Sequence, residues 1–520
     1  MKKNIFYSLL LLLFIPVVGC AKKASTPVVG EVKASAYTPD IPVLKGLATN
    51  AIMRVNLFIP ADQTTQNYTA LNCTINASAI NDIEQITLYQ TSAEPFSTNT
   101  PLATSKPASA NFSIPLTLKL APGLHFIWIS VTLKNEAVIN GMVELRATDL
   151  VQANGKKLTI TQPAGSYAKL KGTAVRKAGD DNVNTYRIPG IVATDKGTLL
   201  SVYDIRYKNS ADLPGNIDVG LSRSVDSGKT WQPMKIIMDM GAPHENNGVG
   251  DPAILFDPIT KKIWVAALWS KGNRSIAGSL PGISPDTTGQ FVLVSSDDDG
   301  ITWSAPYTIT PQIKNPKWHL FFNGPGSGIA MKDGKLVFAA QYWNENKMPY
   351  STIIYSADHG ASWKGNLNGP KSNTTESQVV ETTPGTLMLN MRDNRGSYRS
   401  VATTTNMGTT WTEHATSYNA LQDPVCMGSL IKANVKVKGV LKEVLFFSNP
   451  NTTNGRYDIT IKASLDLGQT WLPANQLLID ERNCYGYSSL TQIDTETIGI
   501  LYEGTKDLFF VKVPVASIIK

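Results

Sequence analysis

The sequence predicts an all-β protein in which a β-sandwich is followed by a β-propeller. Three observations lead to this prediction. Short runs rich in β-branched and aromatic residues alternate with Gly, Pro and Asn, helical periodicity is absent, and an eight-residue motif recurs five times in the later part of the chain. With 520 residues, the chain is also too long for a single core, so more than one domain is expected.

The first element is a targeting segment. Residues 1–20 contain a Lys pair, an apolar run that is short for a membrane span, and then Gly19-Cys20. The ending VVGC is similar to a bacterial lipobox, in which the Cys is acylated after cleavage; an ordinary secretory signal is the alternative. We therefore expect an exported protein that is anchored by lipid on Cys20, on the periplasmic face or the surface of a bacterial envelope. No other membrane contact is expected.

Two further elements precede the repeats. Residues 21–44 are small and polar with several prolines, which is typical of a tether. Residues 45–165 are expected to form an accessory β-sandwich. Its predicted strands are Ile52–Ile59, Ile83–Gln90, Phe112–Leu120, His125–Leu133 and Met142–Arg146. This domain either binds carbohydrate or acts as a spacer, and the lack of an obvious aromatic platform favours the spacer.

The repeated motif predicts the propeller, which we expect to occupy residues 171–520. SVDSGKTW at Ser224–Trp231 returns as SDDDGITW (Ser296–Trp303), SADHGASW (Ser356–Trp363), TTNMGTTW (Thr404–Trp411) and SLDLGQTW (Ser464–Trp471). The Trp-to-Trp spacings of 72, 60, 48 and 60 residues are those of propeller blades. In each copy the Asp or Asn can bond turn amides, the Gly permits a left-handed backbone, and the Trp fills space between strands. The acidic run at 297–299 is better explained by such a turn than by calcium.

Composition excludes several classes of function. The net charge of +7 is modest and spread without a basic stripe, so nucleic acid is not an expected partner. Cys73, Cys426 and Cys484 are too scattered for a disulfide framework, and with the five dispersed His they give no metal-ligand spacing. We expect no metal, no cofactor and a monomer.

Arg187 is the first residue that points to a function. It lies in NTYRIPGIV, a run that otherwise reads as a buried strand. A guanidinium keeps its proton in such surroundings, so it needs an anion or water to face.

YRIPG before the first motif, the five motifs, and the stretches LNMRDNRG, TTESQVVE and CYGYSSL together resemble the exo-sialidase (neuraminidase) family. The resemblance extends from about Lys171 to the C-terminus and implies a six-bladed propeller. More weakly, residues 45–165 are similar to the β-sandwich that precedes the propeller in gut bacterial sialidases.

The resemblance implies a carboxylate-binding site made of three arginines, because sialic acid has a carboxylate on its anomeric carbon. Arg187 matches the first arginine, Arg392 the second and Arg456 the third. Arg395 and Arg399 lie close enough to Arg392 to be confused with it. Planar guanidinium groups can grip both oxygens of a carboxylate.

The resemblance also implies the catalytic groups. Tyr487 would be the nucleophile, in place of a carboxylate that the substrate's own carboxylate would repel; the sialidase Tyr is an established exception among glycosidases. A phenol with a pKa of about 10 needs a neighbouring base, and Glu376 matches it. Asp212, on a polar loop, matches the acid/base residue.

Competing and secondary positions remain open. Tyr485 competes with Tyr487 as the nucleophile, while Asp204 and Asp218 compete with Asp212. Arg206 and Asp251 are expected to contact the sugar ring, and Trp269 with the following insert could shape the pocket wall.

We therefore predict a retaining exo-α-sialidase that removes terminal sialic acid from glycoproteins, glycolipids and oligosaccharides. One alternative is a trans-sialidase, which would use the same residues. The other is a non-catalytic propeller that binds sialic acid; it would lack one of the catalytic groups, whereas each has a candidate here.

Overall fold

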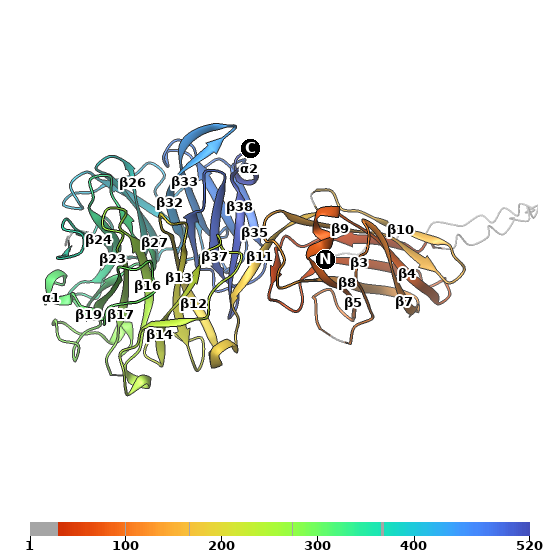
Figure 1. Cartoon of the computed structure of the whole chain (residues 1–520), viewed down its shortest axis with the longest axis horizontal. Helices are drawn as coiled ribbons and strands as arrows, with labels where there is room; N and C mark the ends of the chain where they lie inside the picture. The colour runs from red at the N-terminus through yellow and green to blue at the C-terminus, as the bar shows by residue number, and fades with distance from the viewer. Residues whose placement is uncertain (1–29, 99, 166, 273, 366–368) are drawn as a thin grey trace, which may run out of the picture.

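The computed structural model describes residues 30–98, 100–165, 167–272, 274–365 and 369–520. In these residues the chain folds into two lobes, with the N-terminal strands in one and the later strands in the other (Figure 1). Strands form almost all of the regular structure, beside two four-residue helices in the described part, α1 (Thr310–Ile313) and α2 (Val515–Ile518). The all-β prediction is confirmed. Cys20 and the predicted signal peptide lie outside the described residues.

The N-terminal lobe has two layers of strands around one apolar core. One layer has the order β6-β5-β8-β3-β1, the other contains β7-β4-β9, and β10 pairs with both β1 and β9. The bounds are β1 (Lys33–Tyr37), β3 (Ala51–Ile59), β4 (Gln66–Ile75), β5 (Ile83–Thr91), β6 (Ala103–Ser105), β7 (Asn111–Leu120), β8 (Gly123–Leu133), β9 (Met142–Gln152) and β10 (Lys157–Thr161). All five predicted strands are present. From Ile114 to the end of β7 every second side chain is buried, as expected of a strand with one face on the core.

The predicted tether is wrong over its second half. Lys33–Tyr37 forms β1, which pairs with β3 and β10, and Val43–Lys45 forms β2, which pairs with β11 (Ala168–Arg176). The small residues Ala34 and Ala36 both point into the core, and the residues between and beside them do not. This alternation is that of a strand, despite the tether-like composition of the segment.

The second lobe has a propeller-like arrangement of sheets. Between Thr185 and Asp480 the described residues form five separate sheets of four or five strands, mostly antiparallel. The first is β12 (Thr185–Ala193), β13 (Leu199–Arg206), β14 (Ile217–Ser224) and β15 (Lys235–Met238). The second is β16 (Val249–Phe256), β17 (Ile263–Trp269), β18 (Gln290–Ser296), β19 (Tyr307–Thr308) and β21 (Gly326–Ser327). The third is β20 (Leu320–Asn323), β22 (Ile329–Ala330), β23 (Leu336–Trp343), β24 (Pro349–Ser356) and β25 (Lys364–Gly365). The fourth is β26 (Thr374–Thr383), β27 (Thr386–Asp393), β29 (Ser400–Thr404) and β30 (Thr412–Glu413), and the fifth is β32 (Ser429–Val437), β33 (Val440–Pro450), β34 (Ile459–Ser464) and β35 (Gln476–Asp480). A small pair, β28 (Ser397–Tyr398) with β31 (Gln422–Asp423), lies beside the fourth sheet in the chain.

The last strands join the two lobes. β36 (Ser488–Gln492), β37 (Thr497–Glu503) and β38 (Leu508–Pro514) pair in order, and β38 continues onto β11. Because β11 also pairs with β9 and β2, these strands and the N-terminal lobe form one 14-stranded sheet. The boundary predicted between residues 165 and 171 therefore falls at the start of a shared strand.

The repeated motifs form tight turns at the ends of the sheets. In the first copy Gly228 N–H donates to Ser224 Oγ (2.9 Å) and Thr230 N–H donates to Asp226 Oδ1 (2.9 Å). Gly228 has φ +82°, where a side chain would be strained. The fourth copy keeps both bonds with Thr404 and Asn406 in place of Ser and Asp.

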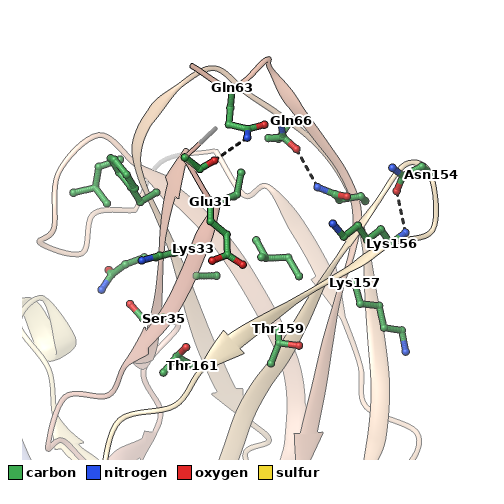
Figure 2. Close-up of a pocket in the computed structure, with 18 residues that line it drawn as sticks. Glu31, Lys33, Ser35, Gln63, Gln66, Asn154, Lys156, Lys157, Thr159 and Thr161 are labelled. Carbon is green, nitrogen blue, oxygen red and sulfur yellow. Dashed lines mark hydrogen bonds between the residues drawn. The ribbon is translucent and has the colours of Figure 1, made fainter. Parts of the chain in front are cut away.

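A polar groove of about 1080 Å³ opens in the N-terminal lobe, where β1 and β10 pair at two positions and then separate. Amide, hydroxyl and amine side chains surround it, among them Gln63, Asn154 and Lys157 (Figure 2). No helix in the described part of the chain is long and apolar enough to cross a membrane.

Candidate active site

The sequence-predicted residues come from separate elements and meet in the second lobe. Arg187 lies near the start of β12, Glu376 near the start of β26 and Arg392 near the end of β27. Arg456 lies in the loop between β33 and β34, and Tyr487 directly precedes β36. Four different sheets therefore contribute to one site.

Tyr487 and Glu376 are in direct contact. The Tyr487 hydroxyl donates a short hydrogen bond to Glu376 Oε1, while Arg392 Nη1 donates to Glu376 Oε2 (2.6 Å) and to the Tyr487 oxygen (3.2 Å). Burial and, after it, the charge of Glu376 raise the pKa of Tyr487 well above its usual value. The phenol therefore keeps its proton, and Glu376 is placed to accept it.

Three guanidinium groups surround the Tyr487 ring. Besides the Arg392 contact, Arg187 Cζ lies 5.4 Å and Arg456 Cζ 5.8 Å from the ring centroid. Arg392 Nε is buried and has no hydrogen-bond partner among the described residues. This concentration of fixed positive charge suits an anion held beside the phenol.

Glu503, at the end of β37, was not predicted from the sequence. Its fully buried carboxylate accepts from Arg187 Nε (3.2 Å), Ile188 N–H (2.8 Å) and Tyr487 N–H (2.9 Å). It therefore fixes a substrate-binding candidate and the nucleophile candidate at once. A Glu that ends the apolar strand TIGILYE is the signal that could have revealed it.

The backbone beside Arg187 is irregular. β12 and β13 change register between Arg187 and Gly190, and Ile188 has φ +56°. A β-branched residue rarely adopts this conformation, which costs about 1–3 kcal/mol. Ile188 is held there by packing against Cys426, Met427 and Tyr487.

Asp212 stands on the loop between β13 and β14 with 67% of its side chain exposed. Arg206 Nη1 (2.7 Å) and Arg187 Nη1 (3.4 Å) donate to its Oδ1. Partial burial opposes its charge, but these two guanidinium groups hold the pKa of Asp212 below its usual value. Asp212 is thus ionised and close to the arginines.

Asp204, a competitor for the acid role, has different surroundings. It is buried, accepts two bonds from Arg206 (3.1 and 2.8 Å), and accepts the N–H of Asp251 (2.8 Å). It orients both of these residues and is closed to solvent.

Asp251 lies beside Asp204 and has a backbone φ of +58°. Asn323 Nδ2 donates a hydrogen bond to its carbonyl oxygen (2.6 Å). Burial and, after it, the charges of Asp204, Glu376 and Asp212 raise the pKa of Asp251 well above its usual value. Trp269 pairs with Val249 at the same end of the second sheet.

The remaining competitors make other contacts. Asp218 is buried and accepts from Tyr207 (3.1 Å). Arg395 binds Asp393 and Ser372, and Arg399 is fully buried against Asn390 and the Cys426 carbonyl. The Tyr485 ring covers Arg187 at 4.4 Å, and its carbonyl accepts from Arg456 (2.9 Å).

Comparison with known proteins agrees with this geometry. Residues 188–482 match the BNR repeat-like domain, and residues 30–157 match the N-terminal domain of BNR-repeat neuraminidase. A sialidase of Bacteroides fragilis (strain YCH46) is 48% identical over 410 residues, which cover 77% of this chain and 75% of that protein. The chain belongs to the sialidase family.

Solved structures extend the sialidase comparison. The Hadza microbial sialidase Hz136 superimposes with a TM-score of 0.86 and 39% identity over 93% of this chain and 100% of that chain. A Trypanosoma rangeli sialidase, solved as a covalent intermediate with 2,3-difluorosialic acid, has a TM-score of 0.55 and 22% identity over 72% of this chain and 57% of that chain, which shows a shared fold. Membership of the family makes this chain an enzyme of the glycoside hydrolase class.

No group of three or more His, Cys, Asp or Glu side chains in the described ranges could hold a metal ion.

Proposed function

We propose that this sialidase is a retaining exo-α-sialidase that hydrolyses terminal sialic acid from glycoproteins, glycolipids and oligosaccharides. The observation that carries the proposal is the contact of Tyr487 with Glu376 inside a ring of three guanidinium groups. A buried phenol with a base at its oxygen and positive charge around it suits attack on a carbon that carries a carboxylate.

In the binding step, Arg187, Arg392 and Arg456 bind the substrate carboxylate. The unpartnered Nε of Arg392 supports this role. Asp251 and Arg206 face the ring substituents. The bound carboxylate partly neutralises the arginines, so the pKa of Asp212 rises from its low value and the residue can hold the proton that an acid catalyst needs.

In the first chemical step, Tyr487 attacks the anomeric carbon while Glu376 takes the phenolic proton. Asp212 gives its proton to the glycosidic oxygen, the bond to the leaving sugar breaks, and a tyrosyl-linked sialic acid remains. In the second step, Asp212 takes a proton from water, whose oxygen attacks the same carbon. Tyr487 leaves and recovers its proton from Glu376, so two inversions give net retention.

The test is hydrolysis of a fluorogenic α-sialoside, with the first-formed anomer of free sialic acid followed by NMR. We expect the α-anomer first, and a loss of at least about 10³-fold in kcat for Tyr487→Phe, because the nucleophile is lost. First release of the β-anomer by the wild type would contradict the retaining mechanism.

The two alternatives give distinct results in the same assay. A trans-sialidase would transfer sialic acid to added lactose faster than to water. A non-catalytic binding propeller would bind sialic acid without releasing it from the sialoside. The Tyr487–Glu376 contact favours an enzyme over the binding propeller.

We also propose that β36, β37, β38 and β11 are the sixth blade of the propeller. Two hydrogen bonds support this: Leu490 N–H donates to Ser429 Oγ of the fifth sheet (3.0 Å), and Ile191 N–H of the first sheet donates to Ser489 Oγ (3.1 Å). These strands therefore bridge the last and first sheets of the ring.

Export and lipid anchoring at Cys20 are proposed on the sequence alone. Radiolabelled palmitate should be incorporated into the wild type expressed in a bacterial host. The Cys20→Ala variant should carry no label and should no longer partition into the detergent phase. A label retained in Cys20→Ala would contradict the anchor.

A glycan-binding role of the N-terminal lobe is favoured by its groove. Amide and hydroxyl side chains such as Gln63 and Thr159 line it (Figure 2). The Phe58 side chain, which also lines the groove and is 49% exposed, offers a ring face for stacking on a sugar. In the Tyr487→Phe background, Phe58→Ala should weaken retention on a mucin column, while Ile236→Ala, an exposed apolar change in the other lobe, should not. Equal retention of both variants would contradict this role.

A further inference from the structure

The segment Glu481–Tyr487 connects β35 to β36 and ends at the nucleophile candidate. Its far end is held within the second lobe. Cys484 N–H donates to the Arg456 carbonyl (3.0 Å), Tyr485 N–H donates to the Gly504 carbonyl (3.0 Å), and Tyr487 N–H donates to Glu503 (2.9 Å). In return, Arg456 Nη1 donates to the Tyr485 carbonyl. The position of this segment thus sets the positions of both Tyr487 and Arg456.

The near end of the segment is held by the N-terminal lobe. The Tyr37 hydroxyl donates to Glu481 Oε1 (2.8 Å), and Asp40 N–H donates to Glu481 Oε2 (3.0 Å). The Glu481 N–H donates to the Asp40 carbonyl (2.9 Å). Three hydrogen bonds therefore link residues more than 400 positions apart in the sequence, at the side of β35 that faces the N-terminal lobe (Figure 1).

The residues that hold Glu481 make further contacts of their own. The Tyr37 ring lies 4.9 Å from the Arg54 guanidinium and packs edge-on to Trp128 at 6.4 Å. Asp40 pairs with Lys169, a buried lysine of β11 (3.3 Å). Burial and the bond to Glu481 raise the pKa of Tyr37 to about 12, so its hydroxyl remains a donor at neutral pH.

We propose that Tyr37 and Glu481 are positioning residues for the active site, through which the N-terminal lobe holds the Tyr487 segment in its reactive geometry. This inference rests on the proposed function. A shift of the segment by even 1 Å at Tyr485 would move the carbonyl that orients Arg456, and misplacement on that scale can cost a large factor in rate. The N-terminal lobe would thus be a part of the catalytic architecture.

The test uses the full chain with Tyr37→Phe, Glu481→Gln and the double variant. Tyr37→Phe deletes one donor and keeps the ring packing. Glu481→Gln keeps one oxygen that can accept from either the Tyr37 hydroxyl or the Asp40 N–H, but it presents an NH₂ group to the other donor. Tyr167→Phe is the matched control, because its hydroxyl bonds the Pro163 carbonyl outside this contact (2.6 Å).

Two measurements are made on each protein. Hydrogen exchange followed by mass spectrometry reports on the amides of Cys484, Tyr485 and Tyr487. Turnover is expressed per competent site, counted by covalent titration with 2,3-difluorosialic acid, so that a smaller folded fraction does not imitate a slower site.

We expect amide exchange in this segment to accelerate about tenfold in both Tyr37→Phe and Glu481→Gln. Turnover per competent site should fall about fivefold in Tyr37→Phe and about twentyfold in Glu481→Gln. The double variant should be no slower than Glu481→Gln within about twofold, since both changes act through one carboxylate. The control should match the wild type. Unchanged exchange, or unchanged turnover per competent site, would overturn the proposal.

These measurements distinguish a failure of the proposed function from a failure of the positioning role of Tyr37 and Glu481. A wild type that neither releases sialic acid nor reacts with the titrant contradicts the proposed function. The exchange measurement still decides in that case whether Tyr37 and Glu481 hold the segment.

Discussion

At the scale of single residues, the site depends on buried carboxylates that bind the arginines and backbone N–H groups around them. Glu503 is the strongest case, because one buried carboxylate holds Arg187 and the backbone of Tyr487. Asp204 does the same for Arg206 and Asp251. Four of the groups that would touch substrate are therefore held by a carboxylate that would not.

Glu503→Gln should lower kcat/KM about 10- to 100-fold, because a neutral amide weakens the bond to Arg187 and cannot accept all three N–H donors. The measurement is steady-state hydrolysis of the fluorogenic sialoside. Glu496→Gln, an exposed residue paired with Lys436, is the control and should retain full activity. Equal activity of the two variants would show that Glu503 has no such role.

Asp218→Asn should stabilise the protein at neutral pH. Burial and, after it, the charge of Asp239 raise the pKa of Asp218 to about 6, above its unfolded value of about 3.9. The folded state therefore binds the proton more tightly, and the stability that Asp218 contributes when protonated is lost as pH rises through about 6.

Urea unfolding between pH 4 and pH 8 checks this. The variant should exceed the wild type by about 1–3 kcal/mol at pH 7.5, with the difference disappearing near pH 4. A difference that does not change with pH would contradict the argument.

The sequence predicted those residues of the site that stand in recognisable motifs. Arg187, Glu376 and Tyr487 were assigned by resemblance, and the structure brings them together; their roles stay predictions. Glu503 and Tyr37 were missed because each acts through a partner more than 300 positions away, and no local pattern encodes such a pairing.

At the scale of elements, the sequence predicted the strands that are rich in apolar β-branched residues and missed strands that are poor in them. β4 has the sequence QNYTALNCTI, in which a register shift between Tyr68 and Ala70 breaks the alternation of buried and exposed residues that identifies a strand. β1 is short and made of small residues, and pairing on both edges makes it a strand. Tertiary contacts, not local preference, decide these two elements.

The turn motifs were predicted with their physical roles, and Asp298 provides a test. Its carboxylate accepts the Thr302 N–H (2.8 Å) and hydroxyl. Asp298→Ala should cost about 1–2 kcal/mol in the free energy of unfolding, because the turn amide loses its acceptor. Asp298→Asn should cost less than about 1 kcal/mol, since Asn406 forms the same bond in the fourth copy.

Asp297→Ala in the same turn is the matched control. Asp297 is exposed and makes a single ion pair with Lys262 (3.2 Å), so the change should stay within about 0.5 kcal/mol of the wild type. Chemical denaturation followed by intrinsic fluorescence measures all three variants. A larger loss in Asp297→Ala than in Asp298→Ala would refute the assignment of the turn acceptor.

At the scale of the whole molecule, the two lobes share structure. β2 pairs with β11, and Leu44 is fully buried in the core of the fifth sheet and the C-terminal strands. A fragment of residues 171–520, cut at the predicted boundary, would lose β2, Leu44 and the first residues of β11.

This fragment should therefore melt at least about 5 °C below the full chain, as a loss of several kcal/mol implies for a protein of this size. Differential scanning calorimetry makes the comparison. A second fragment, residues 41–520, which retains β2, is less informative because it also cuts β1 and exposes the core of the N-terminal lobe. A fragment 171–520 as stable as the full chain would show that the lobes are independent.

The pairing of β11 with β38 also fixes when the molecule can be completed during synthesis. Thr173 lies beside Phe510, so although β2 and β9 can pair with β11 early, the edge of β11 that binds β38 stays unpaired until β38 has been synthesised. A nascent or prematurely terminated chain would present β11 as an open edge, which is a template for aggregation. A truncation before Leu508, which removes β38, should thus leave as little folded protein in the cell as a complete deletion would.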